Sequence, residues 1–210
     1  DTLNVGDAWR KGFRGEGQVI GILDTGVDAS HRELAGKVVA FREFDDDGNP
    51  VNSGLSGASG YDTGTHGTHV SALVVGERFG AAPAAKLAVA AVLTRKGQDG
   101  RHWGYLNQIV GGLRWLVTEM SAPRVSIINA SLGIDDFQPY LYELVRDGED
   151  LGNILFVGSI GNDGPGHSSS PGNYDRVVGV GSVGQDDRAS WFSGSGNSYD
   201  EAGKSVGSKP

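Results

Sequence analysis

The segment VIGILDTG, residues 19–26, decides the fold class because a short, unbroken apolar run ends there at an acidic residue. Residues 19–23 are apolar or glycine without alternation, which is typical of a strand buried on both faces of a sheet. Asp24, Thr25 and Gly26 follow as turn-forming residues. We therefore expect a strand of a parallel, helix-covered sheet, with Asp24 at its carboxyl end.

The rest of the chain alternates similar apolar runs with amphipathic segments. The clearest helix is residues 106–120, where apolar residues recur at helical spacing and polar residues occupy the other face. We expect strands at residues 19–23, 37–44, 87–93, 126–130, 154–158 and 177–183, helices at 70–75, 106–120 and 138–145, and long loops at 45–61 and 161–174. This order predicts a three-layer α/β fold with a mostly parallel central sheet and helices on both faces.

Composition narrows the classes of partner. The chain has 210 residues, of which 38% are hydrophobic and 21% charged, which suits a single globular domain spanning residues 1–210. A formal net charge of -8 disfavours nucleic acid and anionic membranes as partners. There is no cysteine, so neither a disulfide scaffold nor a thiolate site is expected, and no apolar run approaches the roughly 20 residues of a membrane span.

Polar residues follow several of the expected strands. Asp24 follows the first, His66 precedes a helix of small residues, and the tripeptides SLG (131–133) and GND (161–163) follow two later strands. Ligand sites in open parallel sheets gather at the carboxyl ends of the strands. An acid that orients an imidazole, an imidazole acting as base and then acid, and an amide donating to an oxyanion are the groups that acyl transfer requires.

These segments resemble those of the subtilisin-like serine peptidases. The resemblance covers nearly the whole chain and is carried by VIGILDTGVDASHREL (19–34), HGTHV (66–70), INASLG (128–133), GNDG (161–164) and SSSPGNYDRVVGVGSV (168–183). It implies that Asp24 orients His66, that His66 is the general base, and that Asn162 donates to the oxyanion.

The resemblance also implies a peptide-binding groove. The backbone of the groove residues would pair with an extended peptide or protein substrate. The same residues would border the pocket for the substrate residue before the cleaved bond. The residues expected there are Ser131, Leu132, Gly133, Gly158, Ser159, Ile160 and Gly161. Because relatives often carry smaller residues at the positions of Ser159 and Ile160, we expect a modified pocket.

Metal sites have weaker support. His66 and His69 have no third ligand at a suggestive spacing, and H-x-x-H differs from the zinc motif H-E-x-x-H; we expect His69 to be a packed, hydrogen-bonded histidine. The acidic run 45–47, followed by Gly48 and Asn49, raises the possibility of calcium, as in many relatives, but does not fit EF-hand spacing. We expect a solvated loop there, and no metal or other cofactor.

The nucleophile that the resemblance requires is missing from residues 1–210. No G-T-S-x-A-like segment follows Asn162, and the late serines Ser193, Ser195 and Ser198 lie in no such motif. We expect a C-terminally incomplete peptidase domain whose serine lies in a further segment or a second chain, so that residues 1–210 alone are nearly inert and unstable.

The sequence therefore predicts a serine endopeptidase of subtilisin type with an Asp-His-Ser triad. One alternative is a peptide-binding pseudoprotease or natively truncated regulatory form, and another is metal-dependent hydrolysis through His66 and His69. The resemblance and the start of the chain favour a secreted or cell-envelope protein.

Overall fold

The computed structural model describes residues 4–51, 59–120 and 123–210. The chain forms two compact units, residues 1–126 and residues 127–210, and each is described by itself. The predicted one-domain organisation is not tested by this division.

The first unit is built on three parallel strands in the order β2-β3-β1. Strand β1 (Val19–Asp24) is buried at every residue, as its unbroken apolar run predicted. It pairs along its whole length with β3 (Lys86–Ala91), and β3 pairs on its other side with β2 (Val38–Glu43). The last pair of the β1 register joins Asp24 to Ala91, so the acid lies at the carboxyl end of a fully buried strand.

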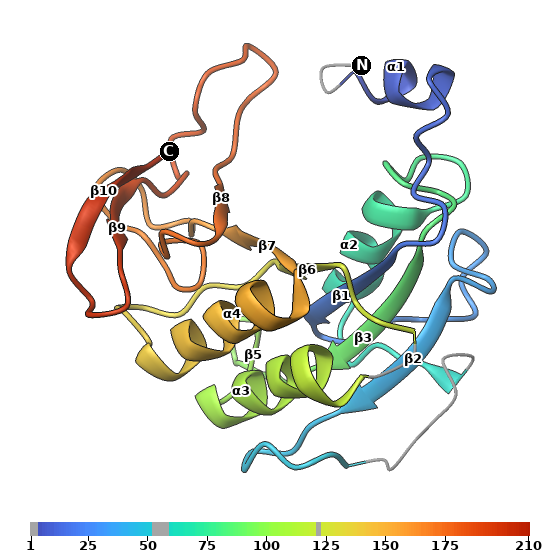
Figure 1. Ribbon diagram of the computed structural model, residues 1–210, viewed down its shortest axis with the longest axis horizontal. Coiled ribbons are helices and arrows are strands. Elements are labelled where there is room, and N and C mark those ends of the chain that lie inside the picture. Colours follow the sequence, from blue (N-terminus) through green and yellow to red (C-terminus); the bar gives the residue numbers. More distant parts are fainter. Residues whose placement is uncertain (1–3, 52–58, 121–122) are drawn as a thin grey trace. The chain divides into compact units, whose positions relative to one another are not determined.

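Helices cover this sheet on both faces. Helix α2 (His66–Val75) and helix α3 (Leu106–Arg114) lie on opposite sides of β1 and β3 in Figure 1. The apolar stripe of α3 buries Ile109 and Leu113, and the π-helix η2 (Trp115–Glu119) continues it with Trp115 and Leu116 buried. A short helix α1 (Val5–Arg10) and a small hairpin of β4 (Arg95–Lys96) and β5 (His102–Trp103) complete the described part of the unit.

The second unit repeats the parallel arrangement with the strand order β6-β7-β8. These strands are β6 (Ile127–Ala130), β7 (Leu155–Ser159) and β8 (Val178–Val180). Helix α4 (Pro139–Gly152) packs on β7, and a hairpin of β9 (Gly196–Tyr199) and β10 (Ser205–Lys209) follows. Four aromatic rings pack together within this unit, at centroid distances of 5.2 to 6.0 Å: Phe137, Tyr142, Tyr174 and Tyr199.

The predicted α/β class is confirmed, and the differences lie at element ends and in short pieces. Helix α2 begins at His66, four residues before the predicted start, and α4 runs on to Gly152. The elements not expected from the sequence are α1, β4, β5, β9 and β10, which are short and rich in polar residues or glycine. Such pieces are stabilised by tertiary pairing, which leaves no periodic signal. Residues 52–58 of the predicted loop lie outside the described residues.

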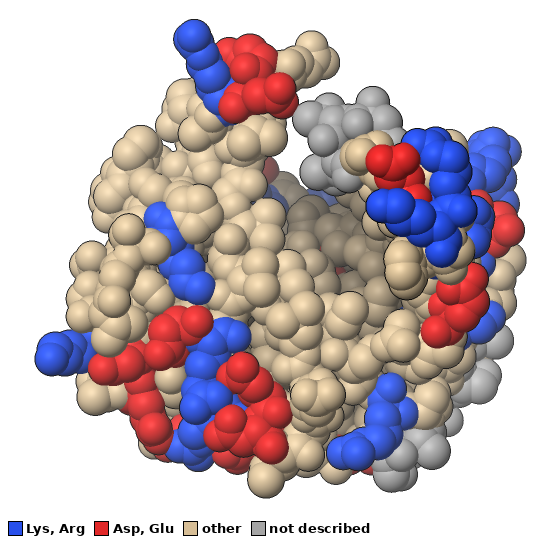
Figure 2. Space-filling model, turned by 45° about the horizontal axis from the view of Figure 1, so that its top comes forward, with Lys and Arg blue, Asp and Glu red and all other residues tan. Residues whose placement is uncertain are grey.

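The surface carries charges of both signs. On the face shown in Figure 2, acidic and basic side chains are interleaved in mixed clusters and form no extended basic patch. In the described part of the chain, no helix is both long and apolar enough to cross a membrane.

Candidate active site

Asp24 is held rigidly at the end of β1. Its side chain is fully buried, and its Oδ1 accepts a hydrogen bond from the backbone N–H of Thr25 at 2.7 Å. Its backbone carbonyl accepts from the N–H groups of Val92 and Leu93, beyond the end of β3, at 2.8 and 3.1 Å. A buried carboxylate needs partners for its lone pairs, and its principal side-chain partner is His66.

His66 is the first residue of α2, and its Nδ1 lies 2.8 Å from Oδ1 and 2.9 Å from Oδ2 of Asp24. Because the carboxylate accepts the Nδ1 proton, Nε2 is left as the basic nitrogen. The hydrogen bond to Asp24 raises the pKa of His66 above its usual 6.5; partial burial opposes this, and the charges of Asp24 and Asp62 reinforce it. The side chain is 53% exposed, so the ring remains accessible to a reactant.

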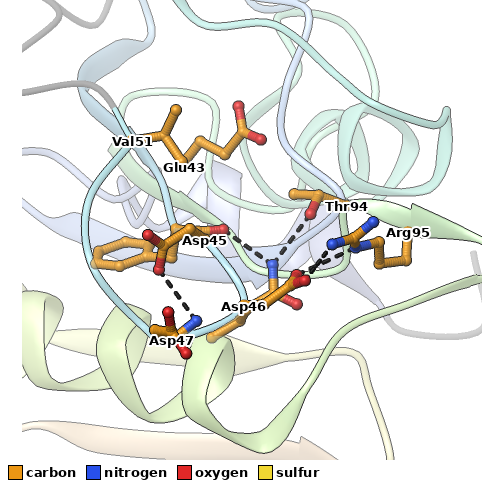
Figure 3. A pocket seen from close by; sticks show the side chains of 9 residues that line it. Glu43, Asp45, Asp46, Asp47, Val51, Thr94 and Arg95 are labelled. Atoms are coloured by element: carbon orange, nitrogen blue, oxygen red, sulfur yellow. Dashed lines mark hydrogen bonds and ion pairs between the residues drawn. The ribbon is translucent and has the colours of Figure 1, made fainter.

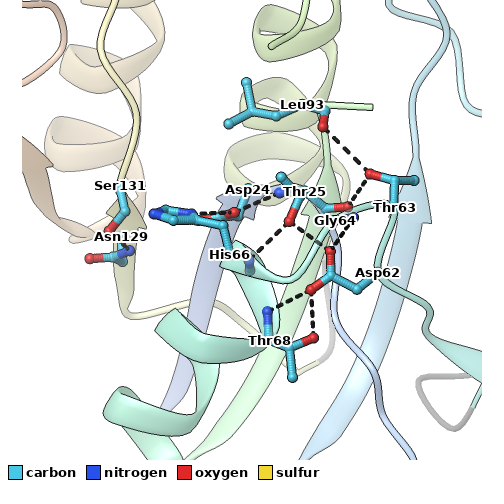
Figure 4. Close-up of polar contacts among 11 residues, drawn as sticks. Asp24, Thr25, Asp62, Thr63, Gly64, His66, Thr68, Leu93, Asn129 and Ser131 are labelled. Carbon is cyan, nitrogen blue, oxygen red and sulfur yellow. Dashed lines mark hydrogen bonds and ion pairs between the residues drawn. The ribbon is translucent and has the colours of Figure 1, made fainter. Parts of the chain in front are cut away.

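A second acid, which the sequence analysis did not single out, fixes the start of α2 (Figure 4). Asp62 accepts hydrogen bonds from Thr25 Oγ1 at 2.6 Å, from the Gly64 N–H at 2.9 Å and from the Thr68 N–H at 2.8 Å. Burial by itself would raise the pKa of Asp62, but these hydrogen bonds outweigh it and lower the pKa below 3.8. The tripeptide Asp-Thr-Gly at 62–64 repeats that at 24–26 and was a signal available in the sequence.

The contact between the two Asp-Thr-Gly segments and α2 is close. The N–H of Gly67 donates to Thr25 Oγ1 at 2.9 Å, and a Cβ at position 67 would lie 2.1 Å from the carbonyl oxygen of Gly26. Only glycine allows this approach, which places His66 beside the end of β1.

The expectation of a packed, hydrogen-bonded His69 is wrong. Its side chain is exposed, and it has no side-chain hydrogen bond within the described residues. It lines a cavity of about 550 Å³ together with His31, Asp28 and Tyr61. One helical turn separates residues 66 and 69, but the ring of His66 turns to Asp24, whereas that of His69 faces solvent.

In the second unit, the side chain of the expected oxyanion donor is accessible to solvent. Asn162 is exposed, and its amide makes no hydrogen bond with any other described residue. Gly161, just before it, has φ +102°, and its carbonyl oxygen accepts a hydrogen bond from the Gly194 N–H at 2.8 Å. This hydrogen bond anchors the loop.

The predicted groove residues of the second unit fall into two groups. The backbone of 131–133 makes no hydrogen bond among the described residues, and the Ser131 Oγ accepts one from the Asn129 amide at 2.9 Å. Gly158 and Ser159 pair with β8 in the sheet. Leu132 is 7% exposed and Ile160 fully buried, with the Ile160 N–H and C=O bonded to Val180 and Ser169. The side chain of Ile160 therefore packs into the core.

In the acidic loop, two of the three aspartates have partners within the protein (Figure 3). Asp45 accepts hydrogen bonds from the N–H groups of Asp47 and Asn49 at 3.1 and 2.8 Å, and Asp46 forms an ion pair with Arg95. In the described ranges, no group of three or more His, Asp or Glu side chains is placed to hold a metal ion.

The late serines are occupied by structural contacts. Ser193 is 6% exposed; its Oγ accepts a hydrogen bond from the Ser182 N–H at 2.9 Å and donates to the Gly194 carbonyl oxygen at 3.2 Å. Ser195 Oγ accepts from the Gly166 N–H at 3.4 Å, and Ser198 is 5% exposed. None of them is paired with an imidazole in the described structure.

Known proteins are similar in sequence to this chain over most of its length. A model described as the subtilase family matches residues 15–205. The chain is 32% identical to the subtilisin-like protease PopC of Myxococcus xanthus, over 93% of this chain and 44% of that protein. It is also 32% identical to an intracellular serine protease of Paenibacillus polymyxa (89% of this chain, 56% of that protein) and to the major intracellular serine protease of Bacillus subtilis (95% and 61%).

The chain thus spans about half the length of these curated relatives, between 44% and 61%. The matched residues run through both compact units and include Asp24, His66 and Asn162. A buried acid bonded to an exposed imidazole and a match over residues 15–205 lead to one conclusion: this chain belongs to the subtilase family of serine peptidases.

Proposed function

We propose that the whole protein is a subtilisin-type serine endopeptidase, in which residues 1–210 supply the acid, the base and one oxyanion donor. The observation that carries the proposal is the pair of contacts from His66 Nδ1 to the buried Asp24 carboxylate, at 2.8 and 2.9 Å. This pairing holds the imidazole in the tautomer whose Nε2 can accept a proton, and it stabilises the imidazolium that then forms.

The proposed reaction uses a serine from a segment outside residues 1–210. His66 Nε2 takes the serine proton while Oγ bonds to the scissile carbonyl carbon, and Asn162 donates to the oxygen that becomes negative. The imidazolium returns the proton to the leaving amine as the C–N bond breaks. Water then repeats the sequence on the acyl-enzyme: His66 deprotonates the water and protonates the departing serine Oγ.

Substrate binding is assigned to residues 131–133. Their backbone N–H and C=O groups have no partner among the described residues, so an extended peptide could pair with them as an added strand. Backbone pairing of this kind does not depend on the side chains of the bound peptide. It therefore suits a peptidase that binds extended segments of varied sequence.

Labelling of the full-length protein by a fluorophosphonate, read by intact mass after denaturation, tests this function. Covalent labelling that maps to a serine outside residues 1–210 is expected, and His66→Ala should abolish it because the base is lost. His69→Ala is the matched control, since that exposed imidazole lies one turn away without contact to Asp24, and labelling should persist.

Other outcomes would overturn the proposal. Absence of labelling together with peptide binding would favour the pseudoprotease alternative, and peptide hydrolysis that chelators stop would favour metal-dependent chemistry. The compartment follows neither from the fold nor from the site, and the expected secretion gains no support from relatives, two of which are named intracellular serine proteases.

A further inference from the structure

A second cavity lies entirely within the second unit and has an acidic lining. It measures about 520 Å³ and is bordered by Asp135, Asp136 and Asp163. The other residues around it are glycine, serine and asparagine together with His167 and Tyr199, and no aliphatic side chain takes part. Its chemistry is therefore that of a polar, negatively charged recess.

The three carboxylates have no cation of their own. Among the described residues, the carboxylates of Asp135, Asp136 and Asp163 form no ion pair and accept no hydrogen bond; the side chains of Gln138 and Ser170 donate to the backbone carbonyl oxygens of Asp135 and Asp136. By contrast, three of the four acids of α4 in the same unit are paired: Asp147 with Arg146, and Glu149 and Asp150 with Arg176. Uncompensated like charges around one recess repel each other, and a bound cation would relieve that repulsion.

Ser169 adds an independent sign of a ligand. It lines the cavity and is only 5% exposed, and its Oγ makes no hydrogen bond within the described residues. Its backbone is fully used: the N–H donates to Ile160 and the C=O accepts from Asn173, both at 3.0 Å. The Oγ atom is not among the enclosed side-chain atoms that lack a partner, so it is reachable from the cavity and is open to a hydrogen bond with a ligand there.

The position of Ser169 connects the cavity to the peptide groove. A Cβ built on Gly161 would lie 2.6 Å from Ser169 Oγ, and one built on Gly133 would lie 3.2 Å from it. The hydroxyl thus lies close to both Gly133 and Gly161, and Gly161 directly precedes Asn162. A substrate side chain bound against these two glycines would lie beside the acidic recess.

We propose that this cavity receives the side chain of the residue before the cleaved bond and that it selects lysine or arginine. The inference rests on the proposed peptidase function. A long, cationic side chain matches spread-out carboxylates better than a metal ion does, because the described residues offer no group of three ligands that converges on one point. Lys and Arg carry three and five N–H donors, which can satisfy Ser169 and several carboxylates together.

The test compares matched peptides in the full-length protein. Fluorogenic peptides identical except for lysine, arginine, norleucine, leucine or glutamate before the scissile bond isolate the charge, because norleucine keeps most of the lysine side chain and lacks the ammonium. We expect kcat/KM for lysine to exceed that for norleucine by on the order of tenfold or more, from several partly exposed ion pairs at about two- to fivefold each. Glutamate should be cleaved least.

Variants assign the preference to the cavity. Replacement of Asp135, Asp136 and Asp163 by asparagine should lower the lysine-to-norleucine ratio by about tenfold, because the asparagines keep the shape of the lining and lose its charge. Asp187→Asn is the control, because Asp187 is exposed and lies outside the cavity, and its carboxylate has no partner among the described residues; the change removes a charge and keeps the backbone hydrogen bond to Gly184. Ser169→Ala should lower cleavage after lysine about two- to fivefold without lowering Tm, since its hydroxyl holds no contact within the protein.

The results separate the two proposals. An enzyme that takes the fluorophosphonate and cleaves after norleucine or leucine as well as after lysine overturns the lysine and arginine preference and leaves the peptidase function standing. A lysine preference that survives the triple asparagine change also overturns it. A protein that neither labels nor cleaves any peptide overturns the proposed function itself, and the inference with it.

Discussion

Thr25 and Asp62 join the two Asp-Thr-Gly segments of the first unit through a hydrogen bond of 2.6 Å, from Thr25 Oγ1 to Asp62 Oδ1. The same Thr25 oxygen accepts the Gly67 N–H, while Asp62 accepts the Thr68 N–H. The residue after Asp24 is thereby tied to the first turn of α2, on which His66 lies. The Asp24–His66 distance is set by this neighbouring network as well as by the pair itself.

Asp62→Ala should therefore destabilise the protein. It removes the acceptor of the Gly64 and Thr68 N–H groups and of the Thr25 hydroxyl, and we expect the free energy of unfolding in urea to fall by roughly 1–3 kcal/mol. Asp47→Ala, at an exposed acid whose side chain accepts no hydrogen bond in the described chain, is the control and should change it by less than about 0.5 kcal/mol.

The lowered pKa of Asp62 also sets the pH at which this contribution is lost. The stabilisation is fully present above the unfolded value near 3.8 and disappears as the pH falls through the lower folded pKa. Equal stability of wild type and Asp62→Ala at neutral pH would contradict the role assigned to Asp62.

The pH profile of catalysis should report His66. Since the bond to Asp24 raises its pKa above 6.5, kcat/KM should rise with pH as the imidazole loses its proton, with a midpoint above 6.5. Asp24→Asn removes that bond, so the midpoint should move to lower pH and turnover should fall by about 10⁴.

The raised pKa of His66 also makes the free energy of unfolding depend on pH. The protonated imidazole contributes stability that is fully present below the unfolded pKa and is lost as the pH rises through the folded pKa. This contribution is therefore smallest at the pH where His66 acts as a base. A midpoint at or below 6.5 in the wild type would count against the Asp24–His66 pairing.

Asn162→Ala tests the oxyanion assignment. Its amide is exposed and unpaired among the described residues, and removal of one such donor in a subtilisin costs about 10²–10³ in kcat. We expect a loss of this size with little change in KM, because the charge develops only in the transition state. Asn107→Ala, at an exposed asparagine of α3, should have no effect. Unchanged turnover in Asn162→Ala would refute the role.

Tyr174→Phe should weaken the second unit. Tyr174 is fully buried, and its hydroxyl donates to the Gln138 carbonyl oxygen at 2.9 Å, just before α4. The Gln138 carbonyl oxygen keeps the Tyr142 N–H as a donor, so we expect the loss of this one buried hydrogen bond to lower the free energy of unfolding by about 0.5–1.5 kcal/mol. Tyr140→Phe is the control, since Tyr140 is 70% exposed. A smaller loss for Tyr174→Phe than for the control would show that the contact is not stabilising.

Calcium removal should leave the acidic loop intact. Asp45 is engaged by the N–H groups of its own turn and Asp46 by Arg95, so two of the three carboxylates of this loop have partners within the protein. We expect Tm to be the same before and after chelation with EDTA. A fall in Tm that added calcium reverses would place a calcium site in the protein.

The sequence by itself determined what depends on local pattern. The unbroken apolar run before Asp24 predicted a buried parallel strand, and β1 is buried at every residue. The apolar stripe of residues 106–120 predicted the helix that became α3 and η2. Short motifs that resemble those of the subtilisin-like peptidases predicted the roles of Asp24, His66 and Asn162.

Tertiary structure decided what depends on contacts between distant residues. Asp62 lies 38 positions after Asp24, and only the folded chain brings it to Thr25 and to the start of α2. Ile160, which the sequence predicted to border the substrate pocket, is buried in the core. His69, which the sequence predicted to be packed, is exposed. The acidic recess likewise brings Asp135, which follows β6, to Asp163 and Ser169, which lie between β7 and β8. Charge and hydrogen bonding at such places are set by packing across the sequence, which a pattern along the chain does not encode.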